Sequence, residues 1–303
     1  MNQNLDKMKA IISQNISFIF QCIVRIFGKR LNRSDVPWLD GMQGNTVLSE
    51  HFYKDFAYKN NINCVRPKNA YGLVDDFNSL NSCNFDTTKV QQQIIDFYEK
   101  TSNYQFDIWM QWKGVFQYLS KIVIRLVSRQ INQLNMPLNN MEISKGMTSD
   151  IIKMYDTNNH YLYACWLRKI MPANKIIYQG FYGTTKIPNN ENVFIKTIFP
   201  LPKGWVCVLL KPIVHEDGSL ELVSKGRHFG DAGYYRIHQL NEKEIKAVYV
   251  PIQESLHLYQ AENCIRCEHN FYVLNQTLLH LHFKITKKQQ EYSLAFPLFN
   301  ASA

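Results

Sequence analysis

Polar and apolar residues alternate through most of the second half of the chain. Between Thr148 and Lys287 the alternation is interrupted by short turn sequences such as 157–159, 202–204 and 216–218. Successive side chains of a strand point to opposite faces of a sheet, and turns this short join antiparallel neighbours. The pattern therefore predicts a meander of about ten antiparallel strands. The predicted strands lie near Asp150–Tyr155, Tyr161–Ile170, Lys175–Thr184, Val193–Phe199, Trp205–Val214, Leu220–Val223, Tyr234–Leu240, Ile245–Pro251, Leu256–Gln260, Ile265–Leu274 and Leu278–Thr286.

Helical spacing does not intervene between these predicted strands, so parallel βαβ units are not expected. A sheet of about ten strands tends either to curl and close or to split into two packed layers. Of the two we expect the first, a barrel or a strongly curved sheet. The predicted fold class is α+β, with a helical N-terminal part packed on this large antiparallel meander.

Apolar residues recur at helical spacing in three stretches of the first half, at Asp6–Leu31, Asp86–Thr101 and Val115–Asn135. The first stretch predicts an amphipathic helix with basic flanks, and its polar interruptions argue against a transmembrane span. This helix packs on the protein's own core or on a second copy, or it lies on an anionic membrane surface. The predicted division of the chain is the basic amphipathic helix 1–33, a helical and irregular segment 34–147, and the barrel-like domain 148–303.

Composition and charge describe a globular, basic protein. Hydrophobic residues make up 46% of the chain and charged residues 19%, which excludes a disordered chain. Lys and Arg number 34 against 25 Asp and Glu, a net charge of +9 that suits anionic partners. The aromatic residues that would stack on bases, such as Trp109 and Trp112, are interleaved with core-like apolar residues, so nucleic acid is not an expected partner. The oligomeric state stays open.

The seven cysteines favour a reducing compartment, because their number is odd and several lie in apolar runs. With no secretory signal in view, we expect a cytoplasmic protein, either free or at a membrane surface. Cys264 and Cys267 form a CxxC pair that, with His269, has the residue types of a zinc site. A second CxxC is missing, and on a strand these two cysteines point to opposite faces. We therefore predict no metal and no cofactor.

Polar residues on one face of the predicted strands suggest a ligand site. Tyr234 and Arg236 share a face of their strand, and His257 and His282 lie on faces of two others. If these faces point into the barrel, the four side chains converge and hold an anionic head group by charge-assisted hydrogen bonds. The alternative is an ordinary row facing solvent. The predicted function is binding of a hydrophobic or amphipathic small molecule, lipid-like or fatty-acid-like, in the barrel cavity.

A glycine-rich stretch, 225–233, is expected to form a wide loop at the mouth of the barrel. It has neither the P-loop ending nor the strand–helix context of a dinucleotide fingerprint. Arg227, His228 and Asp231 are candidate ligand contacts there. An alternative function is an enzyme in which His228 acts as base with Asp231 as its partner, although no nucleophile accompanies them. A third is a membrane-surface scaffold docked through the N-terminal helix.

Several short segments resemble a set of uncharacterised bacterial proteins. The segments are 97–101, 133–138, 180–184, 199–202 and 229–234. The resemblance covers roughly residues 70 to 287 and leaves the N-terminal helix outside. It implies a bacterial, intracellular protein. It carries over no catalytic or binding residue.

Overall fold

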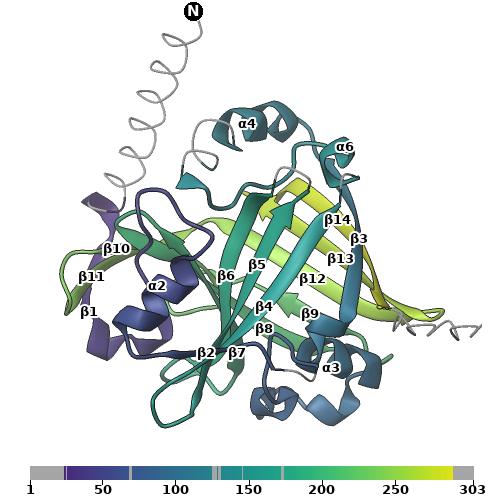
Figure 1. The fold of residues 1–303 in the computed structure, drawn as a ribbon, viewed down its shortest axis with the longest axis horizontal. Coiled ribbons are helices and arrows are strands. Elements are labelled where there is room, and N and C mark those ends of the chain that lie inside the picture. The colour runs from purple at the N-terminus through teal and green to yellow at the C-terminus, as the bar shows by residue number, and fades with distance from the viewer. Residues whose placement is uncertain are drawn as a thin grey trace, which may run out of the picture.

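The computed structural model describes residues 24, 26–67, 70–124, 128, 131–144, 146–171 and 174–288. In this part of the chain 14 strands are joined into one antiparallel sheet system with few short helices (Figure 1). The strands are β1 (Lys29–Asn32), β2 (Asn63–Val65), β3 (Tyr104–Trp112), β4 (Met147–Tyr155), β5 (Tyr161–Ile170), β6 (Lys175–Lys186), β7 (Val193–Leu201), β8 (Gly204–Val214), β9 (Leu220–Val223), β10 (Gly233–Gln239), β11 (Glu244–Val250), β12 (Ile252–Ala261), β13 (Cys264–Val273) and β14 (Gln276–Lys287). The predicted antiparallel meander is confirmed.

The first half of the chain is less helical than predicted. Its described α-helices are α2 (Phe52–Lys59), α3 (Gln92–Glu99), α4 (Phe116–Val123) and α6 (Asn140–Ile143), with short 3₁₀ turns between them. Most of the predicted helix Asp6–Leu31 lies outside the described residues, and its last part forms strand β1 instead. Strands β2 and β3 also come from this half and join the sheet. The fold is therefore mostly β.

Strand β8 is the point where the sheet forks. One edge of β8 pairs with β7 from Gly204 to Leu210, whereas the other edge pairs with two strands in succession. Its first part faces β10, as in the pair Val208 and Tyr234, and its last part faces β9, as in the pair Lys211 and Val223. The first layer accordingly runs β2-β4-β5-β6-β7-β8-β10-β11-β1, and the second runs β8-β9-β12-β13-β14-β3.

The expected barrel or strongly curved sheet of about ten strands is not what forms. The main strand order ends at β2 and β3, and these end strands do not pair within the described residues. The physical reason is the fork, because β9 and β10 occupy the same edge of β8 and lead their partners β12 and β11 into different layers. The layers meet through side chains, as where the rings of Phe106 on β3 and Trp166 on β5 lie 5.6 Å apart.

Two large hydrophobic clusters follow from the alternation of side chains. One lies on the far face of the first layer under α2 and includes Phe181 and Trp205, both fully buried. The other lies between the layers, next to α3, and draws Val208 from the first layer and Ile265 from the second. Leu279, Leu281 and Ile285 share a face of β14, and each retains 3% exposure. The interlayer face is therefore largely apolar, and the polar groups on it stand out.

The glycine-rich loop lies at the fork, between β9 and β10. The Asp231 carboxylate accepts the backbone N–H groups of Arg227 and His228, each at 2.9 Å. The Tyr249 hydroxyl donates to the Gly226 carbonyl at 2.9 Å. A Cβ on Gly226 would lie 2.2 Å from the carbonyl oxygen of Ala232, so this position requires glycine. The loop is a compact, internally bonded turn.

Candidate functional site

The four residues expected to converge are divided between two places. Tyr234 faces the space between the layers and packs against the hydrophobic cluster there. Arg236 shares its face of β10 but donates to the carbonyls of Pro202 and Trp205, each at 3.1 Å, and to that of Ile237. Burial lowers the pKa of Arg236 to about 10. Its guanidinium is thus engaged by backbone of the β7–β8 turn.

His257 and His282 lie on the opposite, outer face of the second layer. The register pairs His257 with Glu268 and Glu268 with His282, while the intervening Cys267 and Leu258 point to the interlayer core. His282 Nδ1 is 2.5 Å from the Glu268 carboxylate, which His280 Nε2 also contacts at 2.5 Å. These histidines form an outer polar row and do not join Tyr234 and Arg236.

The loop residues Arg227, His228 and Asp231 are grouped together, but not as a base and its partner. Arg227 and His228 are exposed. The Asp231 carboxylate is bound to their backbone N–H groups, and those hydrogen bonds lower its pKa. The contact between Asp231 and His228 runs through the backbone rather than the imidazole ring.

Between the layers lies a polar cluster that was not predicted. It is composed of Arg168 on β5, Tyr178 and Tyr182 on β6, Tyr234 on β10, Glu254 on β12 and His269 on β13. Arg168 and Glu254 are both buried, with exposures of 5% and 7%. The first layer supplies the cation and the second layer the carboxylate. We call this group the interlayer cluster site.

Glu254 is well partnered on its side of the site. His269 Nε2 lies 2.8 Å from its carboxylate. Burial, the negative charge of Glu254 and a hydrogen bond to it raise the pKa of Tyr234 well above its usual value. The backbone of Glu254 is fixed by Ser224, whose hydroxyl accepts the Glu254 N–H at 2.7 Å. The carboxylate is therefore held in place from two layers.

Arg168 is less completely partnered. Its guanidinium carbon lies 5.1 Å from the ring centroids of both Phe106 and Trp166. Arg168 faces Tyr178 across the β5–β6 pair. Its Nε has no hydrogen-bond partner in the described part of the chain. Burying a charged donor without a hydrogen-bond partner costs free energy. Such a group is rare in a folded protein and often marks a functional position.

The rings around the site keep some accessible surface although two layers enclose them. Phe199 and Tyr182 from the first layer and Phe106, Phe271 and Phe283 from the second are half-buried. The arrangement offers an apolar, aromatic surface next to an unsatisfied guanidinium N–H. It is suited to a molecule that has an apolar body and an anionic end.

Sequence reasoning missed Arg168 because it lies in a strand predicted only by its apolar content. The signal was present in the run Ala164–Ile170, where Arg168 and Trp166 share one face. Both faces of this strand are buried, so the two adjacent basic residues within the run, Arg168 and Lys169, indicated a buried cation on each face.

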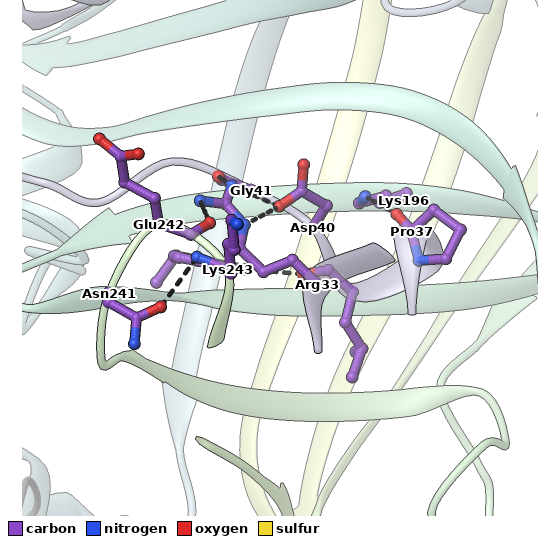
Figure 2. Close-up of polar contacts among 10 residues, drawn as sticks. Arg33, Pro37, Asp40, Gly41, Lys196, Asn241, Glu242 and Lys243 are labelled. Atoms are coloured by element: carbon purple, nitrogen blue, oxygen red, sulfur yellow. Dashed lines mark hydrogen bonds and ion pairs between the residues drawn. The ribbon is translucent and has the colours of Figure 1, made fainter. Parts of the chain in front are cut away.

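A second polar cluster ties the segment Arg33–Gly41 to the first layer (Figure 2). Arg33 donates to the Asp40 carboxylate at 2.5 and 2.8 Å and to the Gly41 carbonyl at 3.2 Å. The buried Lys196 donates to the Pro37 carbonyl at 3.2 Å, and burial lowers its pKa. These contacts hold two 3₁₀ turns over the outer core, which is a structural role.

The CxxC pair does not assemble a metal site in the described residues. Cys264 and Cys267 are both buried, and Cys264 Sγ donates to the Ala261 carbonyl at 3.2 Å. Within the ranges that the structure describes, no group of three or more His, Cys, Asp or Glu side chains is placed to hold a metal ion.

Comparison with known proteins gives one informative relative. The chain is 24% identical over 272 residues to a Bacillus subtilis protein described as "Uncharacterized membrane protein YndJ". The match covers 86% of this chain but 45% of that protein, so the chain spans less than half of its relative. The expected resemblance to uncharacterised bacterial proteins is confirmed.

Two other comparisons found no match. No protein-family model matches the chain, and no solved structure matches it. Among the described residues no helix is both long and apolar enough to cross a bilayer.

Proposed function

We propose that this chain binds an amphipathic small molecule with an anionic end, lipid-like or fatty-acid-like, between its two β-layers. The observation that carries the proposal is the buried Arg168, whose Nε has no hydrogen-bond partner among the described residues and points to a missing acceptor. An anionic oxygen at that nitrogen would form a charge-assisted hydrogen bond and remove the cost of the unpaired donor. The half-buried rings beside it would cover the apolar body.

The test is native mass spectrometry of the freshly purified protein, followed by organic extraction. We expect an excess mass that disappears on denaturation, with a lipid or related amphiphile in the extract. Arg168→Met should reduce the bound fraction about tenfold or more, because a hydrogen bond to a charged group is worth roughly 1.5–3 kcal/mol. Arg266→Met, the same change on the outer face of the second layer, is the matched control.

Two results would count against this function. One is a wild-type protein that carries no ligand and takes up none from a mixture of amphiphiles. The other is equal ligand retention by Arg168→Met and Arg266→Met.

A second candidate is attachment to a membrane surface, and a specific observation favours it. The relative is named a membrane protein. Helices α4 and α6 and the β13–β14 turn lie at one end of the molecule (Figure 1), and exposed apolar residues belong to these elements or directly adjoin them. They are Val115 67%, Tyr118 67%, Leu119 55%, Met141 75% and Leu274 79% exposed. Exposed apolar and aromatic side chains at one end of a basic protein suit the interface of an anionic bilayer.

Vesicle flotation tests this candidate. The full chain should float with vesicles that contain anionic lipid, and the double substitution Tyr118→Ser, Leu119→Ser should reduce flotation. Tyr58→Ser on α2, which changes an even more exposed aromatic residue away from this end, should not. Equal flotation of both variants would remove this end as the docking surface and leave the N-terminal segment, predicted as a membrane-docking helix, as the alternative.

A further inference from the structure

The interlayer cluster site contains one buried arginine and one buried glutamate. Arg168 brings one positive charge, and Glu254 brings one buried negative charge that is already partnered by His269 and Tyr234. Both groups lie against the hydrophobic cluster between the layers. Arg168 lies over the ring of its member Trp166, and Glu254 is bound to His269, whose ring stacks on Phe283 at the edge of that cluster. A bound anion therefore meets one attracting group and one repelling group in a region of low polarity.

We infer that the interlayer cluster site selects a singly charged carboxylate over a doubly charged phosphate ester. This inference rests on the proposed function and names the chemical class of its ligand. One guanidinium neutralises one negative charge. The second charge of a phosphate ester would remain uncompensated in a buried space that also holds the Glu254 carboxylate, and an unpaired charge of like sign in a buried site is strongly unfavourable.

The geometry of Arg168 agrees with a carboxylate head. Its contacts with the rings of Phe106 and Trp166 restrict the orientation of the guanidinium. The unpartnered atom is Nε. The Nε–H and a neighbouring N–H of an arginine form a planar fork that matches the two oxygens of a carboxylate. A lysine ammonium has the charge but not this fork.

The experiment is displacement of a fluorescent fatty-acid probe at pH 8, where a phosphate monoester is fully doubly charged. The competitors are palmitate, hexadecyl phosphate and hexadecanol, which share a chain length. We expect palmitate to bind about tenfold more tightly than hexadecyl phosphate, which corresponds to about 1.4 kcal/mol. Arg168→Lys should weaken palmitate and leave hexadecanol nearly unchanged.

The decisive variant is Glu254→Gln, which keeps the shape and removes the repelling charge. It should strengthen hexadecyl phosphate and narrow the preference for palmitate about fivefold or more. Glu268→Gln, which also removes a carboxylate held by histidine but on the outer face, should leave the preference unchanged.

The outcomes separate the two proposals. If the protein binds neither the probe nor, by native mass spectrometry, any of the three competitors, the proposed function fails. If it binds hexadecyl phosphate but not the fatty-acid probe, only the selectivity for a carboxylate is overturned. If the probe binds but palmitate and hexadecyl phosphate compete equally, or Glu254→Gln and Glu268→Gln behave alike, the site is retained and its selectivity for a carboxylate is overturned.

Discussion

At the scale of single residues, Asp96 joins helix α3 to the edge of the second layer. Its carboxylate accepts from Lys100 Nζ at 2.7 Å, Lys287 Nζ at 2.9 Å and the Tyr104 hydroxyl at 2.7 Å. Burial alone would raise the pKa of Asp96, but these hydrogen bonds lower it below its usual value. A lowered pKa means that the stabilisation is present above the unfolded-state pKa of about 3.9 and is lost as the pH falls.

Asp96→Asn should therefore lower the free energy of unfolding at pH 7 by about 1–2 kcal/mol. The difference in the free energy of unfolding between the variant and the wild type should become smaller as the pH drops below about 4, because the carboxyl of wild-type Asp96 is then protonated on unfolding. Urea unfolding at a series of pH values measures both effects. Asp107→Asn, which removes an exposed carboxylate from the neighbouring β3, is the control, and equal losses in the two variants would contradict the role of Asp96.

Two arginines show how far single residues could be interpreted from the sequence. Arg236 was predicted to hold a ligand, and its strand and face were right, but the carbonyls that bind it come from the β7–β8 turn. Those partners depend on tertiary contacts that strand alternation does not contain. Arg168 lies on the same layer and was overlooked, yet its Nε lacks a partner within the described chain. The sequence located both charges on strands and could not say which one was satisfied.

At the scale of elements, the glycine-rich loop connects β9 and β10, the two strands that share one edge of β8 at the fork. Gly226 lies against Ala232 and Asp231, and an added Cβ would lie 2.4 Å from Asp231 Cβ. Gly226→Ala should therefore push the two sides of the loop apart and lower stability by about 2–3 kcal/mol, the range of overpacked sites. Thermal unfolding measures the loss.

A matched substitution comes from another glycine of the chain. Gly114 has a φ of +52° and nothing within 4 Å of an added Cβ. Asparagine tolerates that backbone conformation, so Gly114→Asn should change stability by less than about 0.5 kcal/mol. If Gly226→Ala were equally harmless, the close packing of the loop would not be what fixes the fork.

Strand alternation predicted the second half of the chain well and the first half poorly. Most predicted strands from Tyr161 to Thr286 match observed ones within a few residues, because their turns are short and local. Strand β3 was not assigned, although the inward residues Tyr104, Phe106 and Ile108 alternate with polar ones. The fork itself left no local signal, since it depends on which strand reaches the free edge of β8 first.

At the scale of the whole molecule, β8 belongs to both layers, so neither layer can lose it and remain intact. Trp205 on β8 is fully buried in the outer core, whereas Val208 and Leu210 on the same strand belong to the interlayer core. Separating the layers would expose the interlayer cluster site and most of the second hydrophobic cluster at once. We therefore expect the two layers to unfold together, despite a chain length at which separate transitions are common.

Hydrogen exchange and calorimetry test this expectation together. Amides of β7, β8 and β13 should exchange with the same free energy of opening, because each becomes exposed only in the globally unfolded state. The calorimetric and van't Hoff enthalpies should agree for the main transition. A first transition in which β12–β14 lose protection while β4–β7 keep it would show that the second layer opens on its own. In that case a ligand could enter between the layers without global unfolding, and Arg168 would be reached by partial opening of the sheet.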